Sequence, residues 1–169
     1  LPGLPGNYSG CWLAIGPYHT LYVLAVPADS SEYPMVYALT SSGDVKWRVD
    51  IQEAGVDFHF AAVGPDGEFY VHFGRKTVYR IDKDGQLVNF ATIPGDFART
   101  ILVDSASNVY TCGSGYLCTF RSDGSLKWEL PIAVDGYYLA MGTGGTIYLA
   151  GEDPEQEVKL YAISHGLAK

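Results

Sequence analysis

Three side chains with binding chemistry stand at one step of an internal repeat: His59, Arg99 and Tyr137. Cys11 occupies the same step in the first copy of the repeat. A histidine, a guanidinium and a phenol brought together could hold an anionic or sugar ligand through charged hydrogen bonds and stacking contacts. They converge only if the repeats are arranged around a common axis. The alternative is that they are ordinary residues near the starts of strands.

Two of the three cysteines form a candidate disulfide. Cys112 and Cys118 flank a short predicted turn, so they lie near each other in a hairpin and could oxidise in a secretory compartment. Neighbours in a hairpin often lack good disulfide geometry, so a reduced pair is the alternative. Cys11 is then left over, and no Cys/His spacing is typical of zinc.

No residue pattern predicts catalysis. Segment 82–85 resembles the opening of a calcium loop but lacks the later acceptors, so we expect a plain turn. The glycine-rich segment 142–145 is followed by neither a lysine nor a predicted helix, which argues against a phosphate-binding loop. His72 is expected to be a packing or surface residue. We therefore predict no catalytic residue, no metal and no cofactor.

The composition is that of a β protein. The 169 residues include 13 Tyr, 7 Phe and 20 Gly, and the hydrophobic fraction of 47% is ample for a core. No stretch approaches the roughly 20 apolar residues that span a bilayer. The net charge is −8 and the basic residues are scattered, which argues against nucleic-acid binding because that requires a basic surface.

A repeat of about forty residues organises the chain. The turn glycines Gly43, Gly85, Gly124 and Gly166 are 42, 39 and 42 residues apart. In the second copy, strands are predicted at 58–64, 68–73, 77–82 and 86–91, with turn residues between them. A period near forty with four short strands predicts the blades of a β-propeller. We expect an N-terminal extension at 1–10 and blades at about 11–54, 55–95, 96–136 and 137–169.

The connection between the second and third strands differs among the copies. It is tight in the second and third copies but long in the first and fourth. The fourth connection holds four carboxylates, at Glu152, Asp153, Glu155 and Glu157. Insertions in repeat proteins often map to the binding face, although a solvated loop tip is the simpler interpretation.

The outer half of each repeat resembles the PQQ-like (quinoprotein-type) β-propeller repeat. The resemblance is carried by a glycine turn followed by tryptophan at 42–47 and 122–128 and by the turn at 83–85, and it covers about residues 11–166. It implies a ring of seven or eight blades sealed by the tryptophans. In enzymes of this family, residues near the axis hold pyrroloquinoline quinone (PQQ) and calcium. This sequence departs from the pattern, since Asn89 replaces one tryptophan and the fourth copy stops where its outer strand should begin.

Three architectures are consistent with four copies: a small closed ring, half of an eight-bladed homodimer, or a fragment of a larger propeller. An open arc would expose apolar blade faces at both ends, so we favour pairing or a larger ring. We predict a non-catalytic binding or scaffold module that recognises a protein or glycan partner. The alternatives are part of a PQQ-dependent oxidoreductase, which would use PQQ with calcium, and the sensor propeller of a signalling protein. The compartment stays open, with a periplasmic or secreted location favoured.

Overall fold

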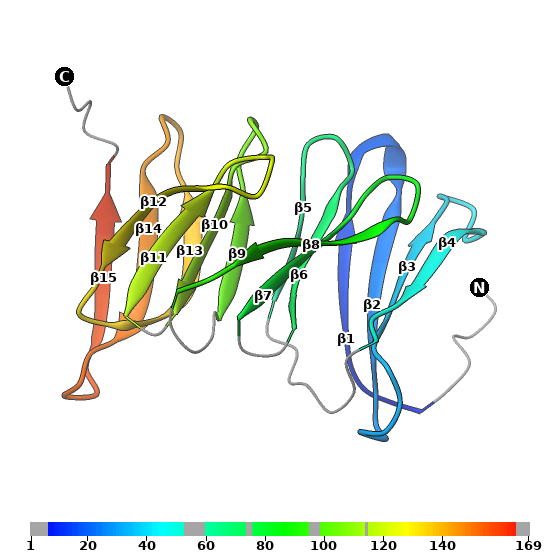
Figure 1. Ribbon diagram of the computed structural model, residues 1–169, viewed down its shortest axis with the longest axis horizontal. Helices are drawn as coiled ribbons and strands as arrows, with labels where there is room; N and C mark the ends of the chain where they lie inside the picture. Colours follow the sequence, from blue (N-terminus) through cyan, green and yellow to red (C-terminus); the bar gives the residue numbers. More distant parts are fainter. Residues whose placement is uncertain (1–6, 53–59, 74–75, 95–98, 114, 165–169) are drawn as a thin grey trace.

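The chain folds into four antiparallel β-sheets that follow one another along the sequence (Figure 1). The structure is a computed structural model and describes residues 7–52, 60–73, 76–94, 99–113 and 115–164. Within these ranges the one helical element is a 3₁₀ turn at Pro17–His19, and no helix is long and apolar enough to cross a membrane. The predicted all-β class is confirmed.

Each sheet is a blade whose strands pair in chain order. Blade 1 consists of β1 (Tyr8–Ile15), β2 (Leu21–Pro27), β3 (Met35–Leu39) and β4 (Val45–Asp50). Blade 2 consists of β5 (Ala61–Val63), β6 (Phe69–Phe73), β7 (Thr77–Ile81) and β8 (Leu87–Thr92). Blade 3 consists of β9 (Thr100–Val103), β10 (Val109–Gly113), β11 (Tyr116–Phe120) and β12 (Leu126–Pro131). Blade 4 consists of β13 (Asp135–Met141), β14 (Ile147–Glu152) and β15 (Val158–Ile163).

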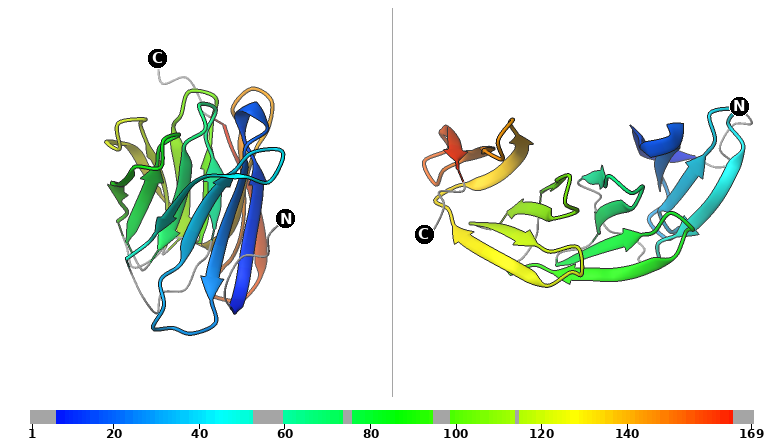
Figure 2. Two further views of the ribbon diagram at one scale, coloured as in Figure 1. Left: turned by 90° about the vertical axis from the view of Figure 1, so that its right-hand side faces the viewer. Right: turned by 90° about the horizontal axis from the view of Figure 1, so that it is seen from above.

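The blades stand side by side in an open arc (Figure 2). Strands β1, β5, β9 and β13 form the inner row, each beside the next, and β4, β8 and β12 lie on the outside. The described residues do not close a ring, so the small closed ring is wrong and the protein is a partial propeller. Blade 4 has three strands in the described part of the chain, in agreement with the predicted lack of an outer strand.

Aspartate and glycine residues make the turns that space the strands. In the turn after β7, the Asp82 carboxylate accepts backbone N–H groups two and four residues ahead, at 2.9 and 2.8 Å. Gly85 in the same turn has φ +84°, in the left-handed region that glycine adopts without strain. Asp104 and Asp153 accept the same pair of N–H groups in the turns after β9 and β14. The turn at 82–85 is therefore formed by the local backbone, as the sequence predicted.

The hydrophobic core lies between neighbouring blades. Tyr22 and Leu24 of blade 1 pack with Phe69 and Ile81 of blade 2, and similar clusters join blades 2 and 3 and blades 3 and 4. Tyr22 stacks on Phe69 with ring centroids 5.7 Å apart. Because each cluster draws side chains from two sheets, no blade has a complete core by itself.

A phenylalanine replaces the tryptophan missing from blade 2. Asn89 is exposed, whereas the next residue, Phe90, is buried with its ring 5.1 Å from Tyr70. The corresponding rings in blades 1 and 3 are Trp47 on Tyr22 and Trp128 on Tyr110, at 5.9 and 6.3 Å. Each outer strand has one irregularity in its pairing with the third strand of its blade, and in β8 it lies farther from the turn than in β4 and β12. The ring that points toward the core therefore comes from Phe90, one residue later than expected. The aromatic contact between the second and fourth strands is therefore kept in blade 2.

The inner strands are less buried than their apolar sequences suggested. We expected them to be covered on both faces by neighbouring blades. Leu13 and Ile15 of β1 are instead 60% and 77% exposed, while the middle strands β3 and β10 are buried throughout. The physical reason for β1 is that, within the described residues, no other blade packs on its free side.

Candidate functional site

Arg99 is the one predicted binding residue whose side chain the structure describes. His59 lies outside the described residues. Tyr137 belongs to β13, where pairing with β14 shifts register between Gly136 and Tyr138, and its side chain lies outside the described part. The convergence of His59, Arg99 and Tyr137 stays a prediction.

Arg99 connects blade 3 to blade 4. Its backbone N–H donates to the carbonyl oxygen of Cys112 at 2.9 Å, which fixes it just before β9. Its Nε donates to Oδ2 of Asp135, the first residue of β13, at 3.0 Å. The two side chains are 31% and 33% exposed, so solvent reaches both charges. An ion pair this exposed contributes only about 0–1 kcal/mol to stability.

Two aromatic rings meet near the same end of the inner row. Phe60, just before β5, and Tyr138 of β13 contact edge to face, with ring centroids 6.1 Å apart and planes at 80°. Phe60 is half-buried and Tyr138 is 65% exposed. We call Phe60, Arg99, Asp135 and Tyr138 the inner-face cluster, since they lie at or near the starts of three successive inner strands. It combines a half-buried ion pair with an edge-to-face pair of aromatic rings.

Sequence reasoning named Arg99 but not the other three members of this cluster. Phe60 and Tyr138 each follow a predicted residue, His59 or Tyr137, by one position. Successive residues of a strand point to opposite faces, so an offset of one residue selects the other side. Asp135 has no counterpart in the other repeats. The one feature of the sequence that could have pointed to it is its negative charge, which can pair with Arg99.

The candidate disulfide between Cys112 and Cys118 is wrong. Both thiols are free, as is that of Cys11. Cys118 pairs with Thr111 across β10 and β11, so its side chain shares the face of Thr111 and lies opposite that of Cys112. Cys112 accordingly packs in the core between blades 3 and 4, and Cys118 in the core between blades 2 and 3. Burial raises the pKa of Cys112 to about 12 and that of Cys118 to about 11, which keeps both as thiols.

His72 of β6 is 1% exposed, as expected for a packing residue.

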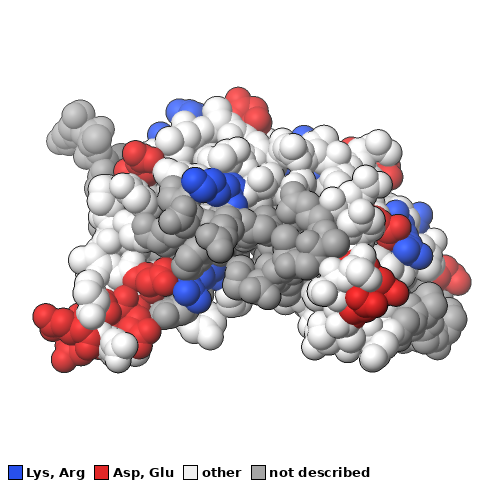
Figure 3. All heavy atoms as spheres, turned by 60° about the horizontal axis from the view of Figure 1, so that its bottom comes forward, with Lys and Arg blue, Asp and Glu red and all other residues white. Residues whose placement is uncertain are grey.

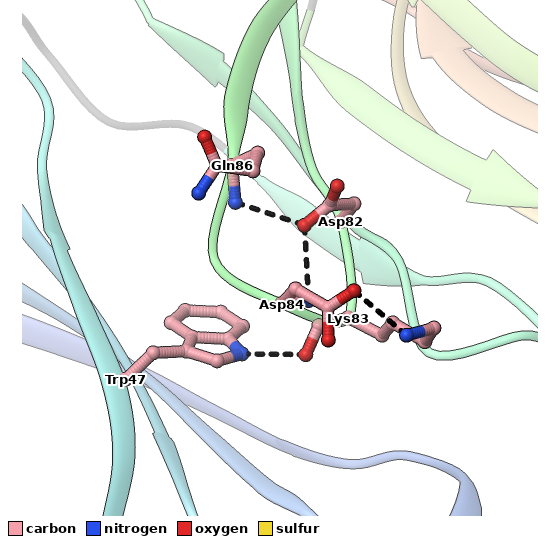
Figure 4. Close-up of polar contacts among 5 residues, drawn as sticks. All are labelled: Trp47, Asp82, Lys83, Asp84 and Gln86. Carbon is pink, nitrogen blue, oxygen red and sulfur yellow. Dashed lines mark hydrogen bonds and ion pairs between the residues drawn. The ribbon is translucent and has the colours of Figure 1, made fainter.

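A crevice of about 230 Å³ opens between blades 1 and 2, at the opposite ends of the strands. The Trp47 indole N–H forms part of its wall and donates to the carbonyl oxygen of Lys83 at 2.9 Å (Figure 4). Lys46 Nζ donates to Thr20 Oγ1 at 2.9 Å, in the same wall. These lining groups already bind each other, so the crevice is better explained as the seam between two blades than as a ligand site.

The acidic connection of blade 4 is a tight turn whose carboxylates form ion pairs with a lysine of the following strand. Strands β14 and β15 extend to Glu152 and Val158, so the long loop that was expected is a five-residue hairpin turn. Acidic side chains gather at this end of the molecule (Figure 3). Carboxylate oxygens of Asp153, Glu155 and Glu157 lie within 4.8 Å of one another.

These carboxylates do not fit calcium. Asp153 accepts two backbone N–H groups, and the one from Glu157 is the first cause of its lowered pKa. The Lys159 ammonium contacts Glu157 and lies 3.3 Å from Asp153. A divalent ion would have to displace this ammonium and compete with the hydrogen bonds of the turn.

Comparison with known proteins supports the fold. No family model matches the chain, and no curated protein matches it. Among solved structures, a streptogramin B lyase matches over 91% of this chain with a TM-score of 0.66 and 12% identity. A gluconolactonase from Xanthomonas campestris matches over 95% with a TM-score of 0.60 and 18% identity. Regucalcin from Agrobacterium tumefaciens, a calcium-binding protein, matches over 87% with a TM-score of 0.59 and 16% identity.

These β-propeller proteins are longer than the chain. The matched region covers 54% of the lyase, 61% of the gluconolactonase and 54% of the regucalcin, so the chain spans little more than half of their length. At such low identity the likeness extends to the fold alone. The propeller part of the predicted resemblance is supported, and the PQQ-like assignment stays a prediction.

Proposed function

We propose that the chain is a non-catalytic propeller module that binds a glycan through the inner-face cluster. The observation that carries this proposal is that a half-buried ion pair and an exposed aromatic ring both stand near the starts of the inner strands, where they join blade 4 to blades 3 and 2. Inner strands of propellers face the central channel, where loops and strand ends can present a shared surface.

The chemistry of the cluster matches that of a sugar ring. Arg99 offers N–H donors and Asp135 offers carboxylate acceptors, which together can engage neighbouring hydroxyl groups. The exposed face of Tyr138 can pack against the apolar C–H face of a sugar, as aromatic side chains do in ligand pockets. A protein partner, the alternative, would instead place a charged side chain on the ion pair.

Binding to a printed glycan array, followed by calorimetry with the best oligosaccharide, tests the proposal. Tyr138→Ala is expected to weaken binding by about 3- to 10-fold, since an aromatic contact contributes about 0.5–1.5 kcal/mol. Arg99→Gln should weaken it as well, because a charged hydrogen bond is lost. Tyr33→Ala is the matched control, since Tyr33 is 46% exposed in the β2–β3 connection of blade 1, and it should bind like the wild type.

Two results would contradict this function. Glycan binding that survives both substitutions would move the site elsewhere. Quinone absorbance with dye-linked alcohol or sugar oxidation, after addition of PQQ and calcium, would favour the oxidoreductase alternative.

A further inference from the structure

The sheet of blade 4 has one face packed on blade 3 and one face open to solvent. Ile147 and Leu149 of β14 are fully buried in the core shared with blade 3. Tyr148, between them, points to the other face and is 43% exposed. Leu160 of β15 is on this same open face, because it pairs with Ala150, and it is 74% exposed. A continuous apolar face of this kind is typical of an interaction surface.

The open face of blade 4 has the register of a face that is buried in blade 1. The matching residues are Tyr148 and Tyr22, Ala150 and Leu24, Leu160 and Val36, and Ala162 and Ala38. In blade 1 this face packs on blade 2, which leaves Tyr22 3% exposed and Val36 fully buried. The hydroxyl of Tyr22 also donates to the carbonyl oxygen of Gly67, in the first turn of blade 2, at 2.8 Å. The open face of blade 4 is therefore built to receive a following blade.

The chain carries a complementary surface at its other end. Leu13 and Ile15 of β1 are 60% and 77% exposed. At the step of Leu13, blades 2 and 3 have Ala61 and Ile101, each only 7% exposed because it packs on the preceding blade. Side chains of β2 on the same face, such as Val23, are already buried within the chain. The exposed apolar surface at this end of the arc therefore belongs to β1.

We propose that a second copy of this chain covers the open face of blade 4 with its own β1, and that the reciprocal contact closes an eight-bladed ring. The contact would repeat what the chain does internally, where β13 packs on β9 and β10 of blade 3. Both ends of the arc face the same open side (Figure 2), so one two-fold axis can relate the two copies. Eight blades lie within the usual range for propellers. This inference is independent of glycan binding.

The mass of the unaltered protein in solution is the first test. Light scattering at micromolar concentration should give twice 18.3 kDa. Leu160→Lys and Ile15→Glu, at opposite ends of the arc, should each reduce the mass to that of one chain. Val45→Lys is the control, because Val45 is 57% exposed on the outer strand β4 and belongs to neither end. Far-UV circular dichroism checks that each variant stays folded, which is expected since all three positions are exposed.

Mixing the two monomeric variants tests which faces meet. A pair made of one Leu160→Lys chain and one Ile15→Glu chain retains one unaltered contact, so a dimer should return at higher concentration. A dimer that only Leu160→Lys disrupts would mean that two blade 4 faces meet, and this would overturn the proposal. A monomeric wild type would also overturn it.

Discussion

Gly124 of blade 3 lies against the backbone of blade 2, and adding one methyl group there measures how firmly the two blades are packed. Gly124 lies in the turn after β11 and has φ +85°. A Cβ atom at this position would lie 2.1 Å from the carbonyl oxygen of Phe90 in β8. Because that oxygen belongs to the backbone of another blade, no rotamer change can remove the clash. Gly124→Ala must therefore move one blade relative to the other.

A matched glycine separates this clash from simple backbone strain. Gly145 has φ +81° in a turn closed by the same pair of backbone hydrogen bonds, but a Cβ there would have nothing within 4 Å. Gly145→Ala should cost only the left-handed backbone term, about 1–2 kcal/mol. Gly124→Ala carries the same term plus overpacking of about 1–3 kcal/mol. Gly85→Ala should fall between them, since its neighbour is the Trp47 side chain at 3.0 Å, which can shift.

Urea unfolding, followed by tryptophan fluorescence and far-UV circular dichroism, measures these differences. With a slope near 2 kcal/mol per molar urea, the midpoint of Gly124→Ala should lie about 0.5–1.5 M below that of Gly145→Ala. Equal midpoints for the two variants would refute the reasoning, because they would mean that the turn of blade 3 does not rest on β8.

Three further outcomes test separate parts of the structure. Phe90→Ala should lower the free energy of unfolding by about 3–5 kcal/mol, whereas Asn89→Ala should change it by less than about 0.5 kcal/mol, both measured in urea. Iodoacetamide should label the exposed Cys11 alone in the native protein and all three cysteines in urea, counted by mass spectrometry. Burial would raise the pKa of Asp104, but hydrogen bonds from an amide, a phenol and backbone N–H groups outweigh it and lower that pKa. The stability advantage over Asp104→Asn should therefore be full above the ordinary carboxyl pKa of 3.8 and disappear as the pH falls through the lowered value, measured by urea unfolding.

The blades could be predicted because their signals are local. Some turns are specified by an aspartate that accepts the backbone N–H groups ahead of it, at Asp82, Asp104 and Asp153, and glycines with positive φ recur in the turns between the third and fourth strands, at Gly43, Gly85 and Gly124. The ring could not be predicted in the same way. Whether four blades close depends on the angle between sheets and on which faces remain uncovered, and neither property is encoded within one repeat.

The candidate site was only partly predictable for a related reason. Alignment of the repeats found the step at which Arg99 stands, but the side of a strand changes at every residue. The pairing of β13 with β14 shifts register between Gly136 and Tyr138, next to the predicted position 137. The same effect explains Phe90, since a shift in β8 brings it to the position predicted for Asn89. Register shifts arise from pairing between strands, which a count along the sequence does not follow.

Tyr148 lies on the face of blade 4 that the proposed second copy would cover, so that copy should add to the stability of the chain. The second-strand tyrosines of blades 1 to 3 each contact an aromatic ring of their own fourth strand, but within the described residues blade 4 has no fourth strand to supply one. A partner that binds only the folded state adds free energy that grows with its concentration. The thermal midpoint of the wild type should therefore rise with protein concentration, while that of Leu160→Lys should not. Scanning calorimetry over a hundredfold range of concentration tests this, and a midpoint independent of concentration in both proteins would mean that no second copy covers blade 4.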